Sequence, residues 1–265
     1  MMDFGMPYLI ETAEVEDAAA LCRALGLQFV ELNRNFPACQ GIGAEELCAL
    51  KERYGIYFTL HIEEECDPFT FNPRVRQAWR QSVLDSLALA KAVGMPILNM
   101  HMPHGVYITL PDRRAILYEQ YFEKYMEDVL SFRDMCQETL RGTDIRIGIE
   151  NTDGFYPNEI KAVEVLLESP FFGLTLDIGH SHGVGDKDIP LYEKHAGSLI
   201  HMHGHDALGR KNHLALGDGE IDLRSRFAWA GRNRARVVLE TKTVAALRTS
   251  VARLQKYLPD ERENM

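Results

Sequence analysis

The sequence lacks the features that mark several classes of protein. The five cysteines of the 265-residue chain are scattered, with no CxxC pair, which argues against a zinc ribbon or a disulfide scaffold. No apolar run approaches the roughly 20 residues that span a bilayer. The N-terminal stretch turns acidic at once and has no basic region typical of a signal peptide. We therefore expect a cytoplasmic protein without membrane association.

Positive charge is also scarce. Lys and Arg number 29 against 39 Asp and Glu, for a net charge of -10, which disfavours nonspecific binding to nucleic acid. The densest basic run, Arg232, Arg234 and Arg236, is expected to be a solvated turn between a helix and a strand. Glycine-rich phosphate loops are missing too, because no predicted strand is followed by GxGxxG or a Walker loop. This counts against a doubly wound open sheet.

Short apolar runs alternate along the chain with segments of helical periodicity. Strands are predicted near residues 8–10, 29–32, 57–61, 97–100, 145–150, 174–177, 199–203 and 237–240. Helices are predicted at 15–25, 44–54, 74–93, about 113–139, 159–168, 190–195, 223–229 and 244–257. Eight such units without a linker, in a chain close to the typical length of about 250 residues, predict an α/β fold, a (β/α)₈ TIM barrel that forms a single domain over residues 1–265.

Acidic residues and histidines occupy the carboxyl ends of all eight predicted strands. Residues two apart share one face of a strand, so His61, His101 and Glu150 would project into the barrel toward its top. Active sites of TIM barrels lie at this end of the strands, and we expect the site there. The strand-end residues are Glu11, Glu31, His61, His101, Glu150, Asp177, His203 and Glu240.

Several carboxylates cannot all stay ionised in a confined space unless a cation joins them. Lys and Arg are scarce at these strand ends, so a divalent metal is the natural counter-charge. Mixed imidazole and carboxylate ligands suit Zn, Mn, Co or Fe better than Ca. For Asp177 alone, an N-cap at the start of a helix is the simpler reading, and for any single histidine so is a hydrogen-bonded core residue. The convergence of eight such residues favours a metal site.

Six segments carry a resemblance to a known family. They are LNMH (98–101), IGIENTDG (147–154), GLTLDIGH (173–180), IHMHGHD (200–206), NHLALGDGEID (212–222) and VLETKT (238–243). Together they resemble the xylose-isomerase-like TIM-barrel superfamily, which includes sugar isomerases and epimerases, hydroxypyruvate isomerases and abasic-site nucleases of the endonuclease IV type.

The resemblance implies a role for each matching residue. His203 is preferred to His201 or His205 as a metal ligand, because Asp206 follows it in the family's His-x-x-Asp pattern. Glu150 and Glu240 would also exchange protons with substrate carbon, and His180, His213 and Arg210 would bind substrate. The implied ligands of one divalent ion (Mn, Zn, Co or Mg) are Glu150, Asp177, His203 and Glu240, and the possible additional metal ligands are His61, His101, His180 and His213.

The departures from the family pattern help to choose between its branches. Lys211 stands where the nucleases have an aspartate ligand for a third zinc, and Gly179 stands where a cysteine is often found. The nuclease sequence Asn-Asp-Ser-Lys is replaced by Gly-His-Asp-Ala at 204–207. These differences favour a metal-dependent isomerase or epimerase that acts on a small sugar, sugar phosphate or hydroxy-keto acid through an ene-diolate. Against them, the segment IENTDG and the presence of His61 and His101 resemble the nucleases.

Two alternatives therefore stay open, a zinc-dependent abasic-site phosphodiesterase and a barrel that binds metal and ligand without turnover. The loops that would select a substrate, 71–79 and 102–114, do not indicate by their sequence which substrate binds.

Overall fold

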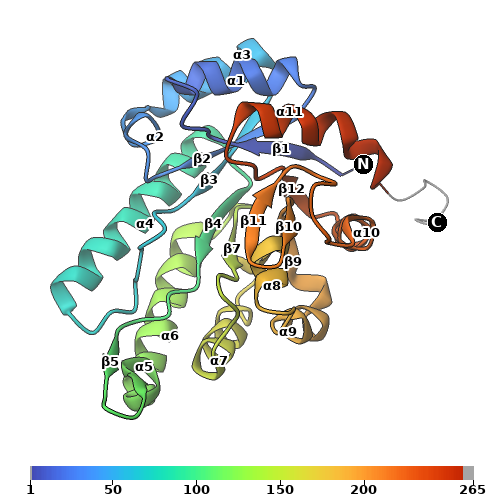
Figure 1. Cartoon of the computed structure of the whole chain (residues 1–265). Helices are drawn as coiled ribbons and strands as arrows, with labels where there is room; N and C mark the ends of the chain where they lie inside the picture. The colour runs from blue at the N-terminus through green and yellow to red at the C-terminus, as the bar shows by residue number, and fades with distance from the viewer. Residues whose placement is uncertain (1, 259–265) are drawn as a thin grey trace.

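Eight parallel strands close into a barrel in the computed structural model, which describes residues 2–258 (Figure 1). The first strand closes it by pairing with the second and with the last. This confirms the predicted (β/α)₈ architecture. In spatial order the strands are β1 (Phe4–Pro7), β12 (Arg236–Val238), β9 (Leu199–His203), β8 (Phe172–Asp177), β7 (Arg146–Glu150), β4 (Ile97–His101), β3 (Tyr57–His61) and β2 (Phe29–Asn33).

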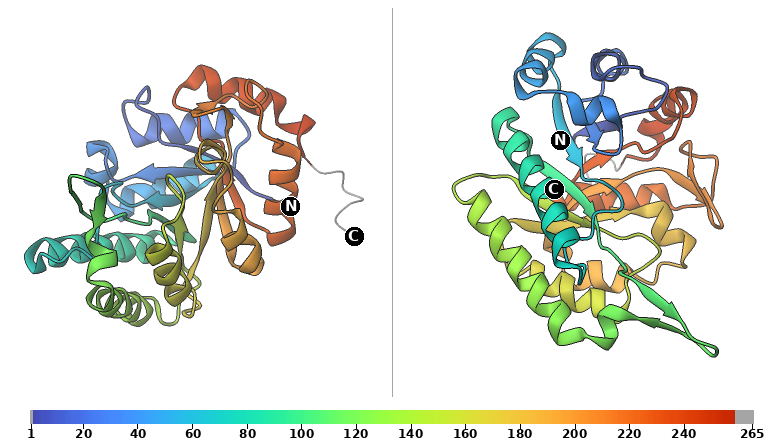
Figure 2. Two further views of the ribbon diagram at one scale, coloured as in Figure 1. Left: turned by 60° about the horizontal axis from the view of Figure 1, so that its bottom comes forward. Right: turned by 90° about the vertical axis from the view of Figure 1, so that its left-hand side faces the viewer.

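Helices surround the barrel (Figures 1 and 2). The longer ones are α1 (Val15–Ala24), α3 (Ala44–Tyr54), α4 (Pro73–Val93), α6 (Phe122–Leu140), α7 (Pro157–Leu166), α10 (Leu223–Asn233) and α11 (Val244–Arg253). Short helical segments are α2 (Pro37–Gly41), α5 (Leu117–Gln120), α8 (Ile178–Gly183), α9 (Ile189–Lys194), η1 (Ala196–Ser198) and η2 (Leu254–Lys256). No helix within residues 2–258 is both long and apolar enough to cross a membrane.

Local sequence explains where the helices begin and end. The Asn72 side chain accepts hydrogen bonds from the first backbone N–H groups of α4, Pro73 occupies the first turn, and Gly94 ends the helix in the left-handed conformation. The apolar residues of each helix pack on the outer face of the strands, so one continuous core lies between the barrel and its helices. Of the basic run, Arg234 lies in the turn between α10 and β12 as predicted, whereas Arg232 belongs to α10 and Arg236 begins β12.

The first strand was predicted in the wrong place. Residues 4–7 pair with β2 and β12, and the backbone leaves the sheet after Tyr8, whose N–H donates to the Glu31 carbonyl. The apolar run at 8–10 instead enters a turn that Thr12 closes by donating from both its N–H and its hydroxyl to the Leu9 carbonyl. Glu11 consequently lies outside the barrel mouth, where it accepts the Val244 N–H at the start of α11.

The long helix predicted from about 113 to 139 is also shorter than expected. Its first residues form β6 (Arg114–Ile116), which pairs with β5 (Tyr107–Thr109) in an antiparallel hairpin. Pro111 lies in the connecting turn, where its fixed φ and missing N–H favour a turn over a helix. This hairpin projects from the barrel in the right-hand view of Figure 2.

A second hairpin, which the sequence analysis did not predict, lies beside the barrel mouth (Figure 1). It pairs β10 (Asp206–Leu208) with β11 (Lys211–Leu214). The buried Asp206 carboxylate accepts the N–H groups of Ala207, Gly217, Gly219 and Ile221, at 2.9–3.1 Å. One charged group thus satisfies four backbone donors and fixes the loop that follows the hairpin.

We predict that Gly5→Ala destabilises the barrel. A Cβ at Gly5 would lie 2.4 Å from the Phe29 ring, which is fully buried and stacked on Tyr57. Overpacking of this kind costs about 1–3 kcal/mol, so the melting temperature should fall by several degrees. Gly231→Ala in α10 is the control, because no atom within 4 Å would meet its Cβ. Equal melting temperatures for both variants would contradict the packing assignment.

Candidate functional site

A cavity of about 500 Å³ opens at the carboxyl ends of the barrel strands. One wall is apolar, from the segment after β1 and the loop after β2: Pro7, Tyr8, Leu9, Ile10 and Phe36. The rest of the lining is polar, and most of the predicted site residues belong to it. Its residues are Glu31, Asn33, His61, Glu64, His101, Glu150, His180, His213, Glu240 and Lys242. The cavity therefore combines a charged floor with a hydrophobic side, as small-molecule sites commonly do.

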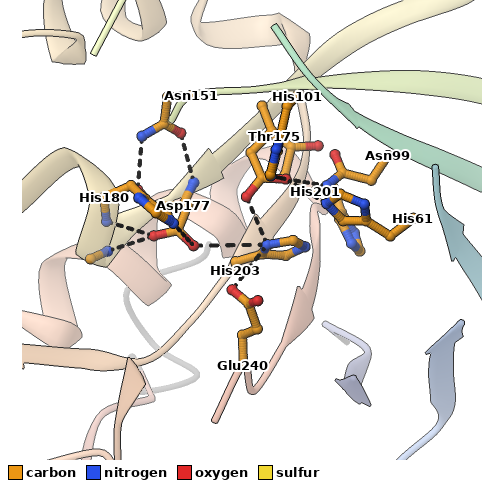
Figure 3. A network of polar contacts seen from close by, with 12 residues as sticks. His61, Asn99, His101, Asn151, Thr175, Asp177, His180, His201, His203 and Glu240 are labelled. Carbon is orange, nitrogen blue, oxygen red and sulfur yellow. Dashed lines mark hydrogen bonds and ion pairs between the residues drawn. The ribbon is translucent and has the colours of Figure 1, made fainter. Parts of the chain in front are cut away.

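His203, at the end of β9, lies among the acidic residues at the base of the cavity but, like Asp177, is not one of the residues that line it (Figure 3). Its Nδ1 is 2.9 Å from Glu150 Oε1, 3.2 Å from Glu240 Oε2 and 3.8 Å from Asp177 Oδ2. The three carboxylates of the predicted metal quartet thus surround one ring nitrogen of its fourth member, His203. The ring itself is buried, with 2% of its side chain exposed.

The second oxygen of Glu150 faces the neighbouring strands β3 and β4. Asn99 donates from its amide to Oε2, and the Nε2 atoms of His61 and His101 lie 3.2 and 3.6 Å from the same oxygen. Nδ1 of His61 donates to the Ile62 carbonyl at 2.6 Å, which leaves its Nε2 as the atom that faces Glu150. Two of the four histidines predicted as possible additional metal ligands, His61 and His101, therefore contact a residue of the quartet directly.

Asp177 has two functions in the structure. Its Oδ1 accepts the N–H groups of Gly179 and His180 at 2.9 and 2.7 Å and so caps α8. Its Oδ2 faces His203. The backbone of Asp177 is held by Asn151, which accepts from its N–H and donates to its carbonyl. The helix-cap and metal-ligand interpretations of Asp177 are compatible, because Oδ1 caps the helix and Oδ2 faces His203.

Glu240 lies just past the end of β12, and each of its oxygens faces a charged group. Oε2 faces His203, and Oε1 accepts from the Lys242 ammonium at 2.7 Å. Lys242 lines the cavity and was not predicted as a site residue. It follows Glu240 by two positions, a spacing that places both side chains on the same side of an extended chain.

A further charged group lies beneath His203 inside the barrel. Glu31 is almost fully buried; its Oε2 accepts from His201 Nε2 at 2.8 Å, and its Oε1 forms an ion pair with His203 Nε2, also at 2.8 Å. A carboxylate on one nitrogen of an imidazole fixes which nitrogen is available on the other side. The pairing with Glu31 therefore turns Nδ1 of His203 toward the quartet.

Two of the three predicted substrate-binding residues line the cavity. His180 and His213 line the cavity with their ring centroids 5.8 Å apart. Nε2 of His180 is 3.9 Å from Asp177, and Nδ1 of His213 is 3.7 Å from Glu240 Oε2. Arg210, in contrast, lies in the exposed turn between β10 and β11 and does not line the cavity. Lys211 is exposed on the same hairpin.

The charges in the floor shift one another's pKa. Burial alone would lower the pKa of His203, but the carboxylates of Glu150, Glu240 and Glu31 raise it well above its usual value. Burial opposes ionisation of Glu150 as well, yet the imidazoles of His203 and His101 hold its pKa well below the ordinary range. Without another cation, the buried carboxylates therefore keep the central histidine protonated.

The geometry fits a divalent ion. Glu150, Asp177 and His203 offer ligand atoms that all lie within 4.8 Å of one another. Nδ1 of His203 and Oε2 of Glu240 are both buried and have no hydrogen-bond partner among residues 2–258. Imidazole and carboxylate atoms that face each other in this way match the donor set of Zn or Mn. Two further groups of this kind are present, His61–His101–Glu150 and His205–His213–Glu240, besides Glu31–His201–His203 below the floor.

Some of these residues could be recognised from the sequence and others could not. Glu31 stands at a predicted strand end and His201 shares the inward face of its strand with His203, so alternation indicated their direction. His205 gave no such signal, because it lies between the end of β9 and a hairpin that was not predicted. The apolar wall around Tyr8 was missed because the first strand was misplaced.

Comparisons with known proteins identify a family and a shared fold. The family described as xylose isomerase-like TIM barrel matches residues 19–257. An uncharacterized protein of Methanocaldococcus jannaschii, MJ1311, is 24% identical over 187 residues, which cover 67% of this chain and 61% of that protein. The chain thus spans less than two thirds of this relative.

Among solved structures, a D-tagatose 3-epimerase-like protein is similar with a TM-score of 0.78 and 21% identity, covering 97% of both chains. A D-psicose 3-epimerase from Clostridium cellulolyticum H10, solved with D-tagatose, has a TM-score of 0.74 at 14% identity and covers 97% of this chain and 98% of its own. The IOLI protein with a binding zinc atom has a TM-score of 0.72 at 13% identity, with 97% and 99% covered. At these identities the likeness shows a shared fold.

We predict that His213 makes stability depend on pH in the metal-free protein. Burial lowers its pKa to about 4, whereas the unfolded value is about 6.5. Between these values the unfolded chain binds a proton that the folded chain does not, so stability rises with pH and is lost as pH falls from about 6.5 to 4. The contribution to the free energy of unfolding should shrink by about 2 kcal/mol from pH 7 to pH 5.

His213→Asn tests this, because Asn tolerates the left-handed backbone at this position (φ 55°) and does not titrate. Urea unfolding at pH 5 and pH 7, with a chelator present, gives the free energies. Histidines that do not contact His213 contribute equally to both proteins and cancel in the difference. The same pH dependence in wild type and variant would contradict the prediction.

Proposed function

Because the chain belongs to the xylose isomerase-like TIM barrel family, we propose that it is a divalent-metal-dependent isomerase or epimerase of a small sugar, sugar phosphate or hydroxy-keto acid. The observation that carries the proposal is the placement of Glu150 and Glu240. Both carboxylates flank His203 Nδ1, and both line the same cavity. Two acids on either side of a bound substrate are the groups that a proton transfer between carbon atoms, or between the faces of one carbon, requires.

The metal would be held by Glu150, Asp177, His203 and Glu240, whose atoms surround one point in the floor. When bound there, a divalent ion supplies Lewis-acid stabilisation of the negative oxygens of an ene-diolate. His180 and His213 would orient hydroxyl groups from the rim, and the wall around Tyr8 and Phe36 would exclude water from one side of the substrate. Arg210 would not contact the substrate, because it lies in the exposed turn between β10 and β11.

The two glutamates are not equivalent, and their surroundings suggest different roles. Glu150 is held by Asn99 and His61 on one oxygen and is 1% exposed. Glu240 is held by Lys242, whose own side chain is 57% exposed, and lies at the open side of the floor. A carboxylate that can exchange its proton near solvent suits the group that delivers a proton to the intermediate. One glutamate would therefore remove a proton from the substrate, and the other would deliver a proton to the intermediate. Glu240 would exchange its proton with solvent more readily than Glu150.

The relatives' names agree with this class of reaction. The similar solved structures include a D-tagatose 3-epimerase-like protein and a D-psicose 3-epimerase, and the zinc atom bound to the IOLI protein accords with a metal site in this fold. The alternative is phosphodiester hydrolysis with more than one metal, and the group His61–His101–Glu150 is the observation that favours it. Exposed Lys211, which cannot ligate, and the net charge of -10 disfavour it.

We predict that Asp177→Asn sharply weakens metal binding. Asn is as good an N-cap as Asp, so α8 should form, but the amide does not supply the carboxylate charge. Elemental analysis after dialysis should show near-stoichiometric metal in the wild type and a large loss in the variant. Glu64→Gln is the control, since it removes one charge from the same cavity without removing a quartet residue. Equal metal contents in wild type and Asp177→Asn would overturn the assigned quartet.

We predict that Glu240→Gln lowers turnover by roughly 10²–10⁴-fold, the effect typical of losing a general acid or base. The amide keeps an oxygen near the metal site but cannot accept a proton. The assay is a panel of ketoses, aldoses and short hydroxy-keto acids incubated in heavy water with Mn, Co, Zn or Mg and followed by NMR. The wild type should incorporate deuterium at carbon, and the variant should do so far more slowly at saturating metal.

Failure would be visible in the same experiment. If no compound in the panel gains carbon-bound deuterium while the protein nicks abasic-site DNA in a metal-dependent manner, the isomerase proposal is wrong and the phosphodiesterase alternative replaces it.

A further inference from the structure

His205 is a fully buried histidine that the proposed reaction does not use. It lies between β9 and β10, behind Asp177 and His213, and it does not line the cavity. Nε2 of its ring is 3.0 and 3.1 Å from the two oxygens of Asp177. Its Nδ1 is 2.8 Å from the backbone nitrogen of His213. One imidazole thus joins a proposed metal ligand to a residue at the cavity rim.

The backbone decides where the proton of His205 resides. The N–H of His213 can only donate, so Nδ1 of His205 must accept and carries a lone pair. The Asp206 carbonyl is farther from Nδ1, at 3.3 Å, and competes poorly for a proton there. In the neutral ring the proton is therefore on Nε2, which donates to the Asp177 carboxylate.

Gly179 makes room for this ring. A Cβ at position 179 would lie 2.0 Å from His205 Cε1 and 2.6 Å from its Nδ1, so no side chain fits there while His205 keeps its place. On the other side, the ring packs against the His213 ring with centroids 4.4 Å apart. Two departures noted in the sequence, glycine at 179 and histidine at 205, are therefore one structural feature.

We propose that His205 is a positioning residue that acts in two directions. Its Nε2–H holds the Asp177 carboxylate in line with His203, and its Nδ1 anchors the β10–β11 hairpin so that His213 stays at the cavity rim. The first of these effects rests on the proposed metal site. The second concerns only the fold of the hairpin and holds whether or not a metal binds.

The same geometry argues that His205 is not itself a metal ligand. His205, His213 and Glu240 have ligand atoms within 4.8 Å of one another, so distance alone would allow a metal there. A metal binds the unprotonated nitrogen of an imidazole. In His205 that nitrogen is Nδ1, which already accepts from His213, while Nε2 carries the proton. The ring acts as a donor to a ligand, as outer-shell groups of metal sites commonly do.

Two substitutions separate the two directions. The amide of a glutamine can reach the place of Nε2, so His205→Gln keeps a donor to Asp177 but loses the acceptor for His213. The carbonyl of an asparagine can reach the place of Nδ1, so His205→Asn keeps the acceptor but loses the donor. We expect His205→Asn to weaken Zn²⁺ and Co²⁺ binding by about 10–100-fold, the usual effect of removing an outer-shell partner. His205→Gln should stay within a few-fold of the wild type.

Hydrogen exchange of the His213 amide, measured without metal, should show the opposite order. His205→Gln should exchange much faster than the wild type, and His205→Asn should remain protected, because it retains the acceptor. Metal affinities are measured by competition with a chelator. A residue with a merely structural role would change both measurements in parallel in the two variants, and that result would overturn the proposal.

The variant Gly179→Ala tests the packing independently. It should displace the ring and produce both defects together, whereas Gly183→Ala on the same helix should produce neither, because no atom within 4 Å meets its Cβ. Long-range ¹H–¹⁵N NMR of the metal-free protein shows the tautomer directly. A proton on Nδ1 of His205 in the neutral ring would overturn the proposal. Loss of one bound metal per chain in both His205 variants, without a change in the affinity of the other metal, would indicate that His205 is a ligand and would overturn it too.

These outcomes are distinguishable from failure of the proposed function. If the wild type binds no Zn²⁺ or Co²⁺, the metal-dependent reaction fails together with the first effect of His205, while the tautomer and the His213 exchange still decide the second. If metal binds as expected but no deuterium enters any substrate, only the reaction is wrong.

Discussion

The site depends on one electrostatic constraint, the convergence of buried carboxylates on a single imidazole. Glu31 approaches one nitrogen of His203, and Glu150, Asp177 and Glu240 surround the other. Buried charges of one sign repel strongly at low dielectric, and removing a partner leaves an uncompensated charge. Such an arrangement persists only when protons or a cation balance it. The His203 proton and the Lys242 ammonium provide part of this balance in the protein alone, and a divalent ion would provide more.

The barrel creates this convergence through strand register. Neighbouring strands pair Asp177 with His203 and His101 with Glu150, so side chains from distant parts of the sequence reach the same level of the barrel. Parallel strands that end together also place every strand end at one mouth. The polar inward residues one step below, Thr59, Asn99, Thr175 and His201, are all buried. Three of them donate to buried carboxylates: Thr59 and His201 to Glu31, and Asn99 to Glu150.

The sequence predicts those parts of the site that follow strand periodicity. Glu150, Asp177 and His203 lie at the ends of strands with clear alternation, and the resemblance to a family fixed which of three nearby histidines belongs to the quartet. Residues on irregular segments escaped prediction for a physical reason. The direction of His205 depends on the β10–β11 hairpin, and that of Tyr8 on a turn closed by Thr12, so neither follows from a period of two or 3.6. Arg210 was assigned from the resemblance to the family, but it lies in the exposed turn of a short hairpin.

Asp177 illustrates how one residue can join the fold to the site. Its carboxylate begins α8, accepts from His205 and faces His203, and its backbone is locked by Asn151, which Tyr192 in turn holds by donating to the amide oxygen at 2.9 Å. Every one of these contacts restricts the carboxylate further, so little conformational entropy remains to be lost when a ligand binds. The helix cap is therefore part of the site's preorganisation. This explains why a strand, a helix start and a buried histidine meet at the residue whose charge the proposed metal requires.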